Sequence, residues 1–299
     1  MNKVLIIIVT YNAMKWVDRC FSSLKESTCP NDVYVVDNGS TDGTQQYIKD
    51  NYPEAIFYQS QENLGFGKAN NAGLEYAIEK GYDYAYLLNQ DAWIYPDTLN
   101  VLIQAAHDNP NFGILSPMQM TGSGKRLDKN FVSTCCSYKF NQYLFEDLYF
   151  GRVGEVYSVK HVMAAHWLMN LNIIKKVGVF SDTFPHYGED TNLCHRMCFH
   201  NFKVGIVPAA KAVHDREYRI QTKAQAVYQI YILLLLRLSN PLDRESIFSL
   251  KIWRDIFSAV FRFHSFSIMP YLLKIILKMK TINKNVMLSK SLNGPFLKR

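Results

Sequence analysis

The chain has 299 residues, of which 48% are hydrophobic and 20% charged, and this composition excludes disordered, collagen-like and low-complexity proteins. The length suits two domains, or one domain with a sizeable appendage. The net charge of +7 is unevenly distributed: residues 1–215 hold 18 Lys and Arg against 22 Asp and Glu, whereas residues 216–299 hold 15 against 4. The basic character therefore belongs to the C-terminal segment.

The first 120 residues alternate apolar, β-branched runs with stretches of helical periodicity, which predicts βαβ units and a mostly parallel sheet flanked by helices. Residues 4–9 are apolar throughout, as expected for a strand that is covered on both faces. Residues 122–160 lack a clear period and are expected to form excursions and short strands. Further strands are predicted at residues 33–36, 55–58, 84–88, 113–117 and 204–207, and helices at residues 15–26, 43–51, 65–80, 98–109 and 190–200.

After about residue 218 the pattern changes to amphipathic helices. Residues 230–236 are strongly apolar, and apolar side chains recur at three- and four-residue spacing over residues 253–264. Basic residues interrupt every candidate spanning segment, so this part of the chain is not expected to cross a membrane. It either lies on a bilayer or covers the α/β domain. We therefore predict an α/β domain at residues 1–217 and a basic, helical C-terminal region at residues 218–299.

The cysteines and the first residues of the chain indicate the cellular compartment to expect for the protein. Six cysteines are scattered without a regular framework, and the first residues lack the pattern of a secretory signal. We expect a reducing, cytoplasmic location. Cys194 and Cys198 share a helix face, but structural zinc sites use spaced pairs of ligands, so these residues are expected to pack in the interior.

Polar segments follow the first four predicted strands, where ligands bind in open α/β sheets. Asp37 ends the second strand, and its carboxylate could hold the following turn or accept a hydrogen bond from the N3–H of a pyrimidine base. Asn89 and Asp91 can point to one side of the chain after the fourth strand, an arrangement that suits Mg²⁺ or Mn²⁺. The segments are Thr10-Tyr11-Asn12, residues 37–40, residues 63–71 and Asn89-Gln90-Asp91.

Two further candidates lie later in the chain. Glu189 and Asp190 lie at the start of the predicted helix at residues 190–200, where they could suit the helix dipole or supply a general base. His214 follows a predicted strand end, and a buried, hydrogen-bonded histidine and a metal ligand are both compatible with that position.

These strings, in this order, resemble the inverting nucleotide-sugar glycosyltransferases of glycosyltransferase family 2, which have the GT-A fold. Each matching string lies at a predicted strand or helix end, and five matches in the order of the family make coincidence a poor explanation. The resemblance covers residues 1 to about 215. The matching strings are residues 9–12, 36–44, 63–73, 87–91 and 187–196.

The resemblance implies a nucleotide-sugar site, in which Asn89 replaces the first aspartate of the metal-binding Asp-x-Asp motif and Asp91 is the last. His214 matches a histidine that completes the metal site in some relatives. Asp190 falls on the catalytic base, and Glu189 falls on an acceptor-site carboxylate. The implied ligands of the nucleotide sugar are Thr10, Tyr11, Asn12 and Asp37 for the uracil or thymine base, together with Asn38, Asn63, Gly65, Asn70, Asn89 and Asp91.

The expected activity is inverting transfer from a UDP- or dTDP-sugar to a saccharide acceptor, as in rhamnosyltransferase-like enzymes of bacterial surface polysaccharide (O-antigen or capsule) synthesis. Relatives commonly use lipid-linked carriers, so the basic tail is expected to contact the inner face of the cytoplasmic membrane. A non-catalytic nucleotide-sugar-binding module, or a membrane-associated partner of a glycan assembly complex, remains the alternative.

Other classes are disfavoured by specific features. A dinucleotide-dependent oxidoreductase needs a glycine fingerprint after the first strand, and this chain has Thr10-Tyr11-Asn12-Ala13 there. A glycoside hydrolase places two carboxyl groups across the scissile bond. Aromatic residues that alternate with aliphatic ones at helical spacing in the tail suit a lipid surface or a helix better than nucleic acid.

Overall fold

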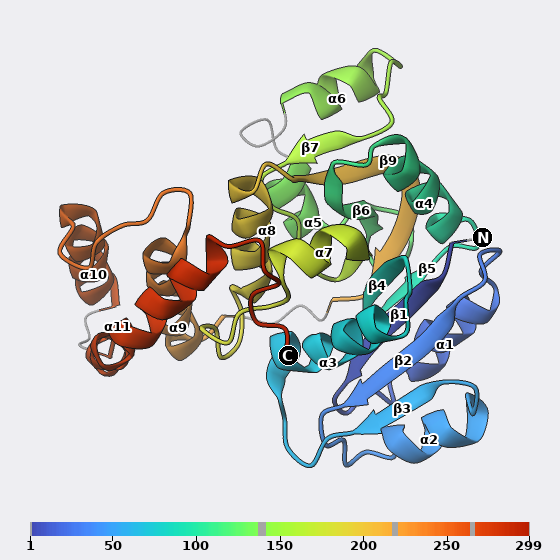
Figure 1. The fold of residues 1–299 in the computed structure, drawn as a ribbon, viewed down its shortest axis with the longest axis horizontal. Helices are drawn as coiled ribbons and strands as arrows, with labels where there is room; N and C mark the ends of the chain where they lie inside the picture. Colours follow the sequence, from blue (N-terminus) through green and yellow to red (C-terminus); the bar gives the residue numbers. More distant parts are fainter. Residues whose placement is uncertain (1, 137–141, 217–220, 264–266, 299) are drawn as a thin grey trace.

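A mixed sheet forms the centre of the molecule (Figure 1). The structure is a computed structural model that describes residues 2–136, 142–216, 221–263 and 267–298. Within these residues the sheet has nine strands, of which eight follow the order β3-β2-β1-β4-β8-β6-β9-β5 and β7 pairs with β9. Its parallel half consists of β1 (Val4–Thr10), β2 (Asp32–Asp37), β3 (Ile56–Gln59) and β4 (Tyr84–Asn89).

The other half of the sheet is mixed. β8 (His166–Asn170) runs antiparallel to both β4 and β6 (Phe112–Met120). β6 pairs in parallel with β9 (Lys203–His214), and the two short strands β5 (Ala92–Ile94) and β7 (Tyr157–Val159) run antiparallel to β9. The short β5 follows β4 directly and places Asp91 beside the end of β9.

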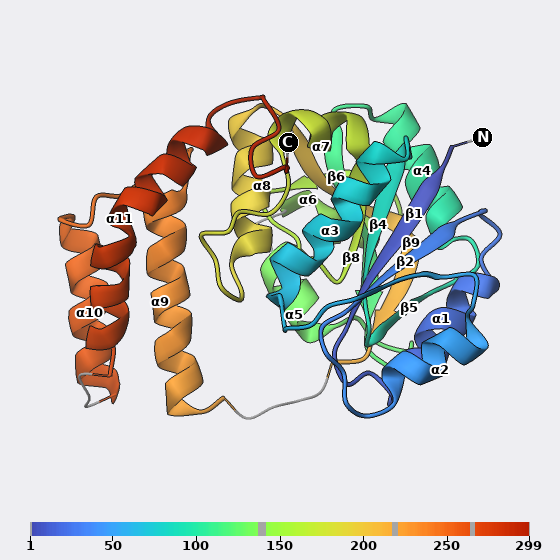
Figure 2. The same ribbon diagram turned by 60° about the horizontal axis from the view of Figure 1, so that its bottom comes forward.

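Helices cover both faces of the sheet (Figure 2). In β1, Leu5 and Ile7 pack with α3, α7 and α8, whereas Ile6 and Ile8 pack with α1, α2 and α4. This two-sided burial explains why the strand is apolar at every position. The helices are α1 (Val17–Lys25), α2 (Thr44–Asn51), α3 (Gly65–Glu79), α4 (Thr98–Asp108), α7 (Leu171–Val177) and α8 (Glu189–Phe199).

The strands and helices predicted for the first 120 residues are present, with ends shifted by a few residues. β5, β8 and α7 were not predicted, and β9 is longer than the predicted strand at 204–207. The excursion at 122–160 contains one short strand, β7, but also the helical segments α5 (Lys129–Phe131), η1 (Val132–Cys136) and α6 (Gln142–Tyr149). Here the prediction of excursions and short strands missed the helices.

Three helices, α9 (Lys223–Ser239), α10 (Leu250–Phe263) and α11 (Met269–Ser289), form an appendage with its own apolar cluster, which Phe184 joins. Asn285 attaches α11 to the α/β part, because its Nδ2 donates to Asp182 Oδ1 at 2.7 Å and to Thr183 Oγ1 at 2.8 Å. None of the helices in the described residues is long and apolar enough to cross a membrane. The predicted domain boundary at residues 217 and 218, and residue 264 at the end of the predicted pattern, lie outside the described residues.

Candidate active site

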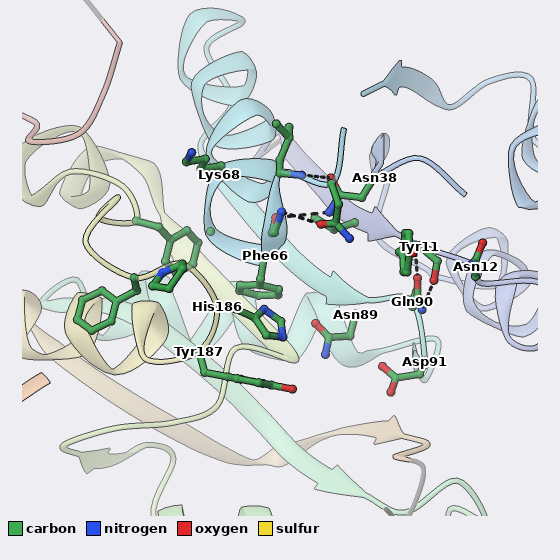
Figure 3. A pocket seen from close by; sticks show the side chains of 18 of the residues that line it. Tyr11, Asn12, Asn38, Phe66, Lys68, Asn89, Gln90, Asp91, His186 and Tyr187 are labelled. Carbon is green, nitrogen blue, oxygen red and sulfur yellow. Dashed lines mark hydrogen bonds between the residues drawn. The ribbon is translucent and has the colours of Figure 1, made fainter. Parts of the chain in front are cut away.

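A cavity of about 1260 Å³ opens at the carboxyl ends of β1, β2 and β4, beside the first turn of α3 (Figure 3). It brings together residues from four of the polar segments and from the end of β9. Five of the predicted site residues do not line it: Thr10, Asp37, Asn70, Glu189 and Asp190. The predicted residues that do line it are Tyr11, Asn12, Asn38, Asn63, Gly65, Asn89, Asp91 and His214.

Gln90 holds the loop after β1 against the end of β4. The backbone N–H of Tyr11 donates to Gln90 Oε1 at 2.7 Å, and Gln90 Nε2 donates back to the carbonyl of Tyr11 at 3.2 Å. This leaves the Tyr11 side chain 49% exposed at the cavity. Asn12 has a left-handed backbone (φ +51°), and its Oδ1 accepts the N–H of Thr41 at 2.8 Å. Gln90 was not assigned a role from the sequence.

Asp37 lies beneath the cavity as a buried hydrogen-bonding centre. Its carboxylate accepts from Thr10 Oγ1 at 2.9 Å, from the N–H groups of Gly39 and Ser40 at 3.1 and 2.9 Å, and from the side chains of Ser40, Gln45 and Gln59. Burial opposes ionisation, but these bonds, led by those of Ser40, lower the pKa of Asp37. With these partners, the carboxylate stabilises the turn that follows β2.

Asn38, the next residue, does face the cavity. It is 4% exposed; its Oδ1 accepts the N–H of Leu64 at 3.3 Å and its Nδ2 donates to the carbonyl of Gly65 at 3.5 Å, which connects the end of β2 to the start of α3 (Figure 3). Asn63 Oδ1 accepts the N–H of Gly65 at 2.9 Å. Gly65 has φ +73°, and a Cβ there would lie 3.2 Å from the carbonyl oxygen of Pro185. Asn70 is buried in α3 and donates to the carbonyl of Phe66 at 3.0 Å.

The acidic corner of the cavity consists of Asp91 and His214. The pairing of β5 with β9 places Asp91 Oδ1 3.3 Å from His214 Nε2, and Asn89 lines the cavity nearby. Burial opposes ionisation of Asp91, but its hydrogen bond to His214 and the charge of that ring outweigh it and lower the pKa. Behind this pair, burial lowers the pKa of His166 to about 3, so that ring is neutral.

Asp91 and His214 have the spacing of two neighbouring ligands of one ion. Ligands at about 2.1 Å from an octahedral cation lie about 3 Å apart at adjacent corners. The buried Nδ1 of His214 has no hydrogen-bond partner among the described residues. Those residues contain no group of three His, Cys, Asp or Glu side chains that could hold a metal ion. The chain thus offers a carboxylate, an imidazole and the Asn89 amide, and the remaining ligands would come from water and substrate.

Glu189 and Asp190 begin α8 and differ in environment. Asp190 Oδ1 accepts the N–H of Thr191 at 2.6 Å, and its Oδ2 lies 3.5 Å from His161 Nε2. Burial opposes ionisation of Asp190, but His161 and Thr191 outweigh it and lower the pKa. Glu189 is 4% exposed, and its Oε2 finds no hydrogen-bond partner in the part of the chain that the structure describes. Burial, with a smaller effect from the charge of Asp190, raises its pKa to about 7.

Aromatic rings form the wall of the cavity that precedes α8 (Figure 3). Tyr187 has a left-handed backbone (φ +66°), and its side chain is 61% exposed. Its ring centroid lies 3.9 Å from that of His186, and Tyr228 of α9 donates to the carbonyl of His186 at 3.0 Å. Lys278 of α11 also lines the cavity, so the appendage contributes to its wall. Tyr187 lay within a matched string, but its left-handed backbone gave no sequence signal.

Comparison with known families identifies this architecture. Residues 5–165, more than half of the chain, match the model of Glycosyl transferase family 2. The chain belongs to glycosyl transferase family 2. This confirms the resemblance drawn from the strand-end motifs.

Curated relatives of this family 2 chain include two rhamnosyltransferases. It is 33% identical over 122 residues to the N-acetylglucosaminyl-diphospho-decaprenol L-rhamnosyltransferase of Mycobacterium tuberculosis, a match that covers 38% of this chain and 40% of the relative. It is 26% identical over 209 residues to the dTDP-rhamnosyl transferase RfbF of Shigella flexneri, covering 70% of this chain and 67% of the relative. The chain thus spans less than half of the mycobacterial relative.

Solved structures share the fold of this family 2 chain. Staphylococcus aureus TarS (residues 1–349) in complex with UDP-GlcNAc has a TM-score of 0.55 at 17% identity, over 96% of this chain and 80% of TarS. The mannosyltransferase PcManGT of Pyrobaculum calidifontis, in complex with GDP-Man and Mn²⁺, has a TM-score of 0.60 at 17% identity, over 93% and 75% of the two chains. These are GT-A glycosyltransferases, so the predicted GT-A fold is confirmed.

Proposed function

We propose that the protein is an inverting glycosyltransferase that moves a sugar from a dTDP- or UDP-sugar to a saccharide acceptor in bacterial surface polysaccharide (O-antigen or capsule) synthesis. The observation that carries this proposal is the cavity in which Tyr11, Asn38, Asp91 and His214 converge from separate strand ends. The names of two relatives favour L-rhamnose as the transferred sugar, and one of them has a decaprenyl-linked acceptor. A lipid-linked acceptor would place the protein at the inner face of the cytoplasmic membrane.

The nucleotide base would bind at the ends of β1 and β2. The exposed ring of Tyr11 offers a stacking surface, and the carboxamide of Asn38 faces the cavity beside it. The oxygens of Asp37 are occupied by Thr10 and by the residues that follow it. Asn38 is buried as well, but its hydrogen bonds to Leu64 and Gly65 are long, at 3.3 and 3.5 Å. We therefore assign the polar contact to the base to Asn38, which would exchange one of these bonds for it. Asp37 would then hold the base-binding loop in shape.

A divalent ion, Mg²⁺ or Mn²⁺, would be held by Asp91 and His214, with Asn89 at the same corner. When bound, it would stabilise the negative charge that develops on the departing nucleoside diphosphate. Asn89 carries no charge, so Asp91 supplies the only carboxylate among these three residues. This predicts weak binding of the ion by the free protein and a contribution from the donor phosphates.

Asp190 would act as the general base, from a partly exposed position at the start of α8 that lies outside the lining of the cavity and that a bound acceptor would have to reach. Its lowered pKa keeps the carboxylate ionised at neutral pH, ready to accept the proton of an acceptor hydroxyl. As that oxygen bonds to the anomeric carbon, the bond between this carbon and the diphosphate oxygen breaks, and the configuration inverts. Glu189, with a pKa of about 7, is partly protonated at neutral pH. It is buried and does not line the cavity, so it would contact the acceptor only if the start of α8 moved on binding.

A donor panel tests the proposal. The protein is incubated with dTDP-rhamnose, UDP-sugars and GDP-sugars, each with Mn²⁺ or Mg²⁺, and the released nucleotide is measured. Slow release from one dTDP- or UDP-sugar is expected without acceptor, and faster release with a sugar diphosphate lipid. Binding of a donor without any release, with or without acceptor, would favour the non-catalytic module, an alternative that the neutral Asn89 supports.

A further inference from the structure

Helix α10 carries more apolar surface than its neighbours cover. Ile252 and Ile256 are buried in the cluster that α9, α10 and α11 share, and Val260 packs against that cluster. Each of them is followed directly by an aromatic residue, which lies about 100° further around the helix. The apolar arc therefore continues beyond the part that faces α9 and α11.

The exposed part of this arc is the outer row, which we define as Leu250, Trp253, Phe257 and Phe261. Their spacing of three, four and four residues places them on one face of α10. Leu250 is 88% exposed and Phe261 is 73% exposed, and the other two side chains are exposed as well. Figures 1 and 2 both show α10 at the end of the appendage farthest from the sheet. Contiguous exposed apolar rows of this kind mark sites of interaction.

The charges around the outer row indicate what covers it. Lys251 and Arg254 lie on the exposed polar side of α10. Asp255, the one acidic residue of this helix, pairs with Arg237 of α9 and also lies 3.5 Å from Arg254 Nε, so the helix keeps an excess of positive charge. The next helix, α11, contains four lysines and no acidic residue. In a symmetric pair of copies, the cations beside one outer row would approach the same cations of the other copy. An anionic lipid surface instead takes the aromatic rings into its interface and the cations among its headgroups.

We propose that the outer row docks the protein on an anionic lipid bilayer. The row inserts at the level of the headgroups while Lys251 and Arg254 extend to the phosphates. This deepens the proposed function, on which it rests in one respect: the acceptor that we propose is lipid-linked and lies in the same bilayer. The following helix, α11, contributes Lys278 to the cavity, so the docked appendage and the active site share a structural element.

Vesicle co-sedimentation of the full chain tests the docking. The vesicles contain either phosphatidylcholine alone or equal parts of phosphatidylcholine and phosphatidylglycerol. The variant Trp253→Ser/Phe257→Ser/Phe261→Ser removes the outer row and keeps both the charges and the buried residues. Its matched control is Tyr149→Ser/Phe150→Ser, which removes two exposed aromatic residues at α6, another edge of the molecule (Figure 1).

We expect the wild type and the control to bind the anionic vesicles, and the outer-row variant to bind at least about tenfold more weakly. The variant Lys251→Glu/Arg254→Glu should lose binding to anionic vesicles at low salt, because the headgroups would repel it. Equal melting temperatures of all variants show that the fold is retained. Binding by the outer-row variant that equals that of the wild type would overturn the proposal.

A second measurement tests whether a second copy of the chain covers the outer row instead of lipid. It also separates the docking proposal from the proposed transfer activity. If light scattering finds a wild-type dimer that the outer-row variant converts to a monomer, and vesicles bind neither protein, the row is an interface between copies and the proposal is wrong. Nucleotide release from a soluble donor is measured on the same samples. Vesicle binding without any nucleotide release would support the docking surface and refute the proposed transfer. Nucleotide release without vesicle binding would support the transfer and refute the docking surface.

Discussion

The Oδ1 atom of Asp91 lies 3.3 Å from Nε2 of His214; Asp91 directly precedes β5, and His214 ends the neighbouring strand β9. The antiparallel pairing of β5 with β9 sets Ala92 opposite His214, so the contact depends on strand register rather than on a flexible loop. The pair therefore reaches the cavity as a preformed unit, in which the carboxylate is kept ionised by its partner.

This geometry predicts that Asp91 dominates metal dependence. Replacement of Asp91 by Asn removes the single carboxylate of the corner, and the Mn²⁺ concentration for half-maximal nucleotide release should rise by at least about tenfold. Replacement of His214 by Ala should have a smaller effect in the same direction, because the carboxylate remains. Asp97→Asn, at an exposed position before α4, is the control. An unchanged Mn²⁺ requirement in Asp91→Asn would show that the ion is held elsewhere.

The variant Asp190→Asn should lower kcat by roughly 10²- to 10⁴-fold, because an amide cannot accept the proton of the acceptor hydroxyl. The affinity for the donor should stay nearly the same, as Asp190 does not line the cavity beside the nucleotide residues. Transfer assays and calorimetry with the nucleotide measure the two effects. Glu62→Gln, on the exposed loop before α3, should behave as the wild type. Retained turnover in Asp190→Asn would exclude it as the base.

The raised pKa of Glu189 predicts that the free energy of unfolding depends on pH. Its folded pKa of about 7 lies above the ordinary glutamate value, so the folded state retains a proton that the unfolded state releases. The stabilising contribution is complete below the ordinary pKa and is lost as the pH rises through 7. The loss is at most roughly 3 kcal/mol. Glu189→Gln cannot ionise, so its free energy of unfolding relative to the wild type should increase from pH 5 to pH 8. Denaturant titrations at both pH values measure this, and a constant difference would contradict it.

The sequence predicted the α/β layers well because burial on both faces leaves a strong pattern, as in the apolar residues of β1. It missed β8, because His166, Trp167, Leu168, Met169 and Asn170 include no β-branched residue, and such a run resembles a helix as much as a strand. β5 is only three residues long, too short to show a period. The pairings that these strands make with β4 and β9 decide their structure, and such long-range contacts are not visible locally.

The candidate site, like the fold, could be predicted from local sequence pattern only in part. The motifs indicated which segments meet, and the cavity residues Asn12, Asn38 and Asp91 come from them. Local pattern could not decide which of two neighbouring polar residues faces the ligand. Asp37 and Asn38 are adjacent at the end of one strand, yet one has its partners below the surface and the other faces the cavity. That choice depends on Gln45 and Gln59, which the fold brings to Asp37 from other elements.

Asp37 and Asn38 should therefore separate stability from binding. Asp37→Ala leaves several buried donors without an acceptor, and we expect the free energy of unfolding to fall by about 3 kcal/mol or more. Asn38→Ala should change stability far less and weaken dTDP or UDP binding by roughly tenfold, the effect of one lost hydrogen bond to the base. Thermal denaturation and calorimetry measure both quantities. Normal stability of Asp37→Ala together with lost nucleotide binding would return the base contact to Asp37.

Tyr187 offers the last test, at a wall of the cavity that we propose receives the acceptor. Its ring centroid lies 3.9 Å from that of His186 at a tilt of 47°, and its exposed ring offers a face against which a sugar ring could pack. Tyr187→Ala should raise the KM for the acceptor by roughly 3- to 10-fold and leave the KM for the donor unchanged. Tyr187→Phe keeps the ring and should retain the wild-type KM for the acceptor. Both substitutions keep a side chain at φ +66°, so neither adds backbone strain and the melting temperatures should stay close. A rise in the donor KM instead would place Tyr187 beside the transferred sugar, on the nucleotide side of the reaction centre.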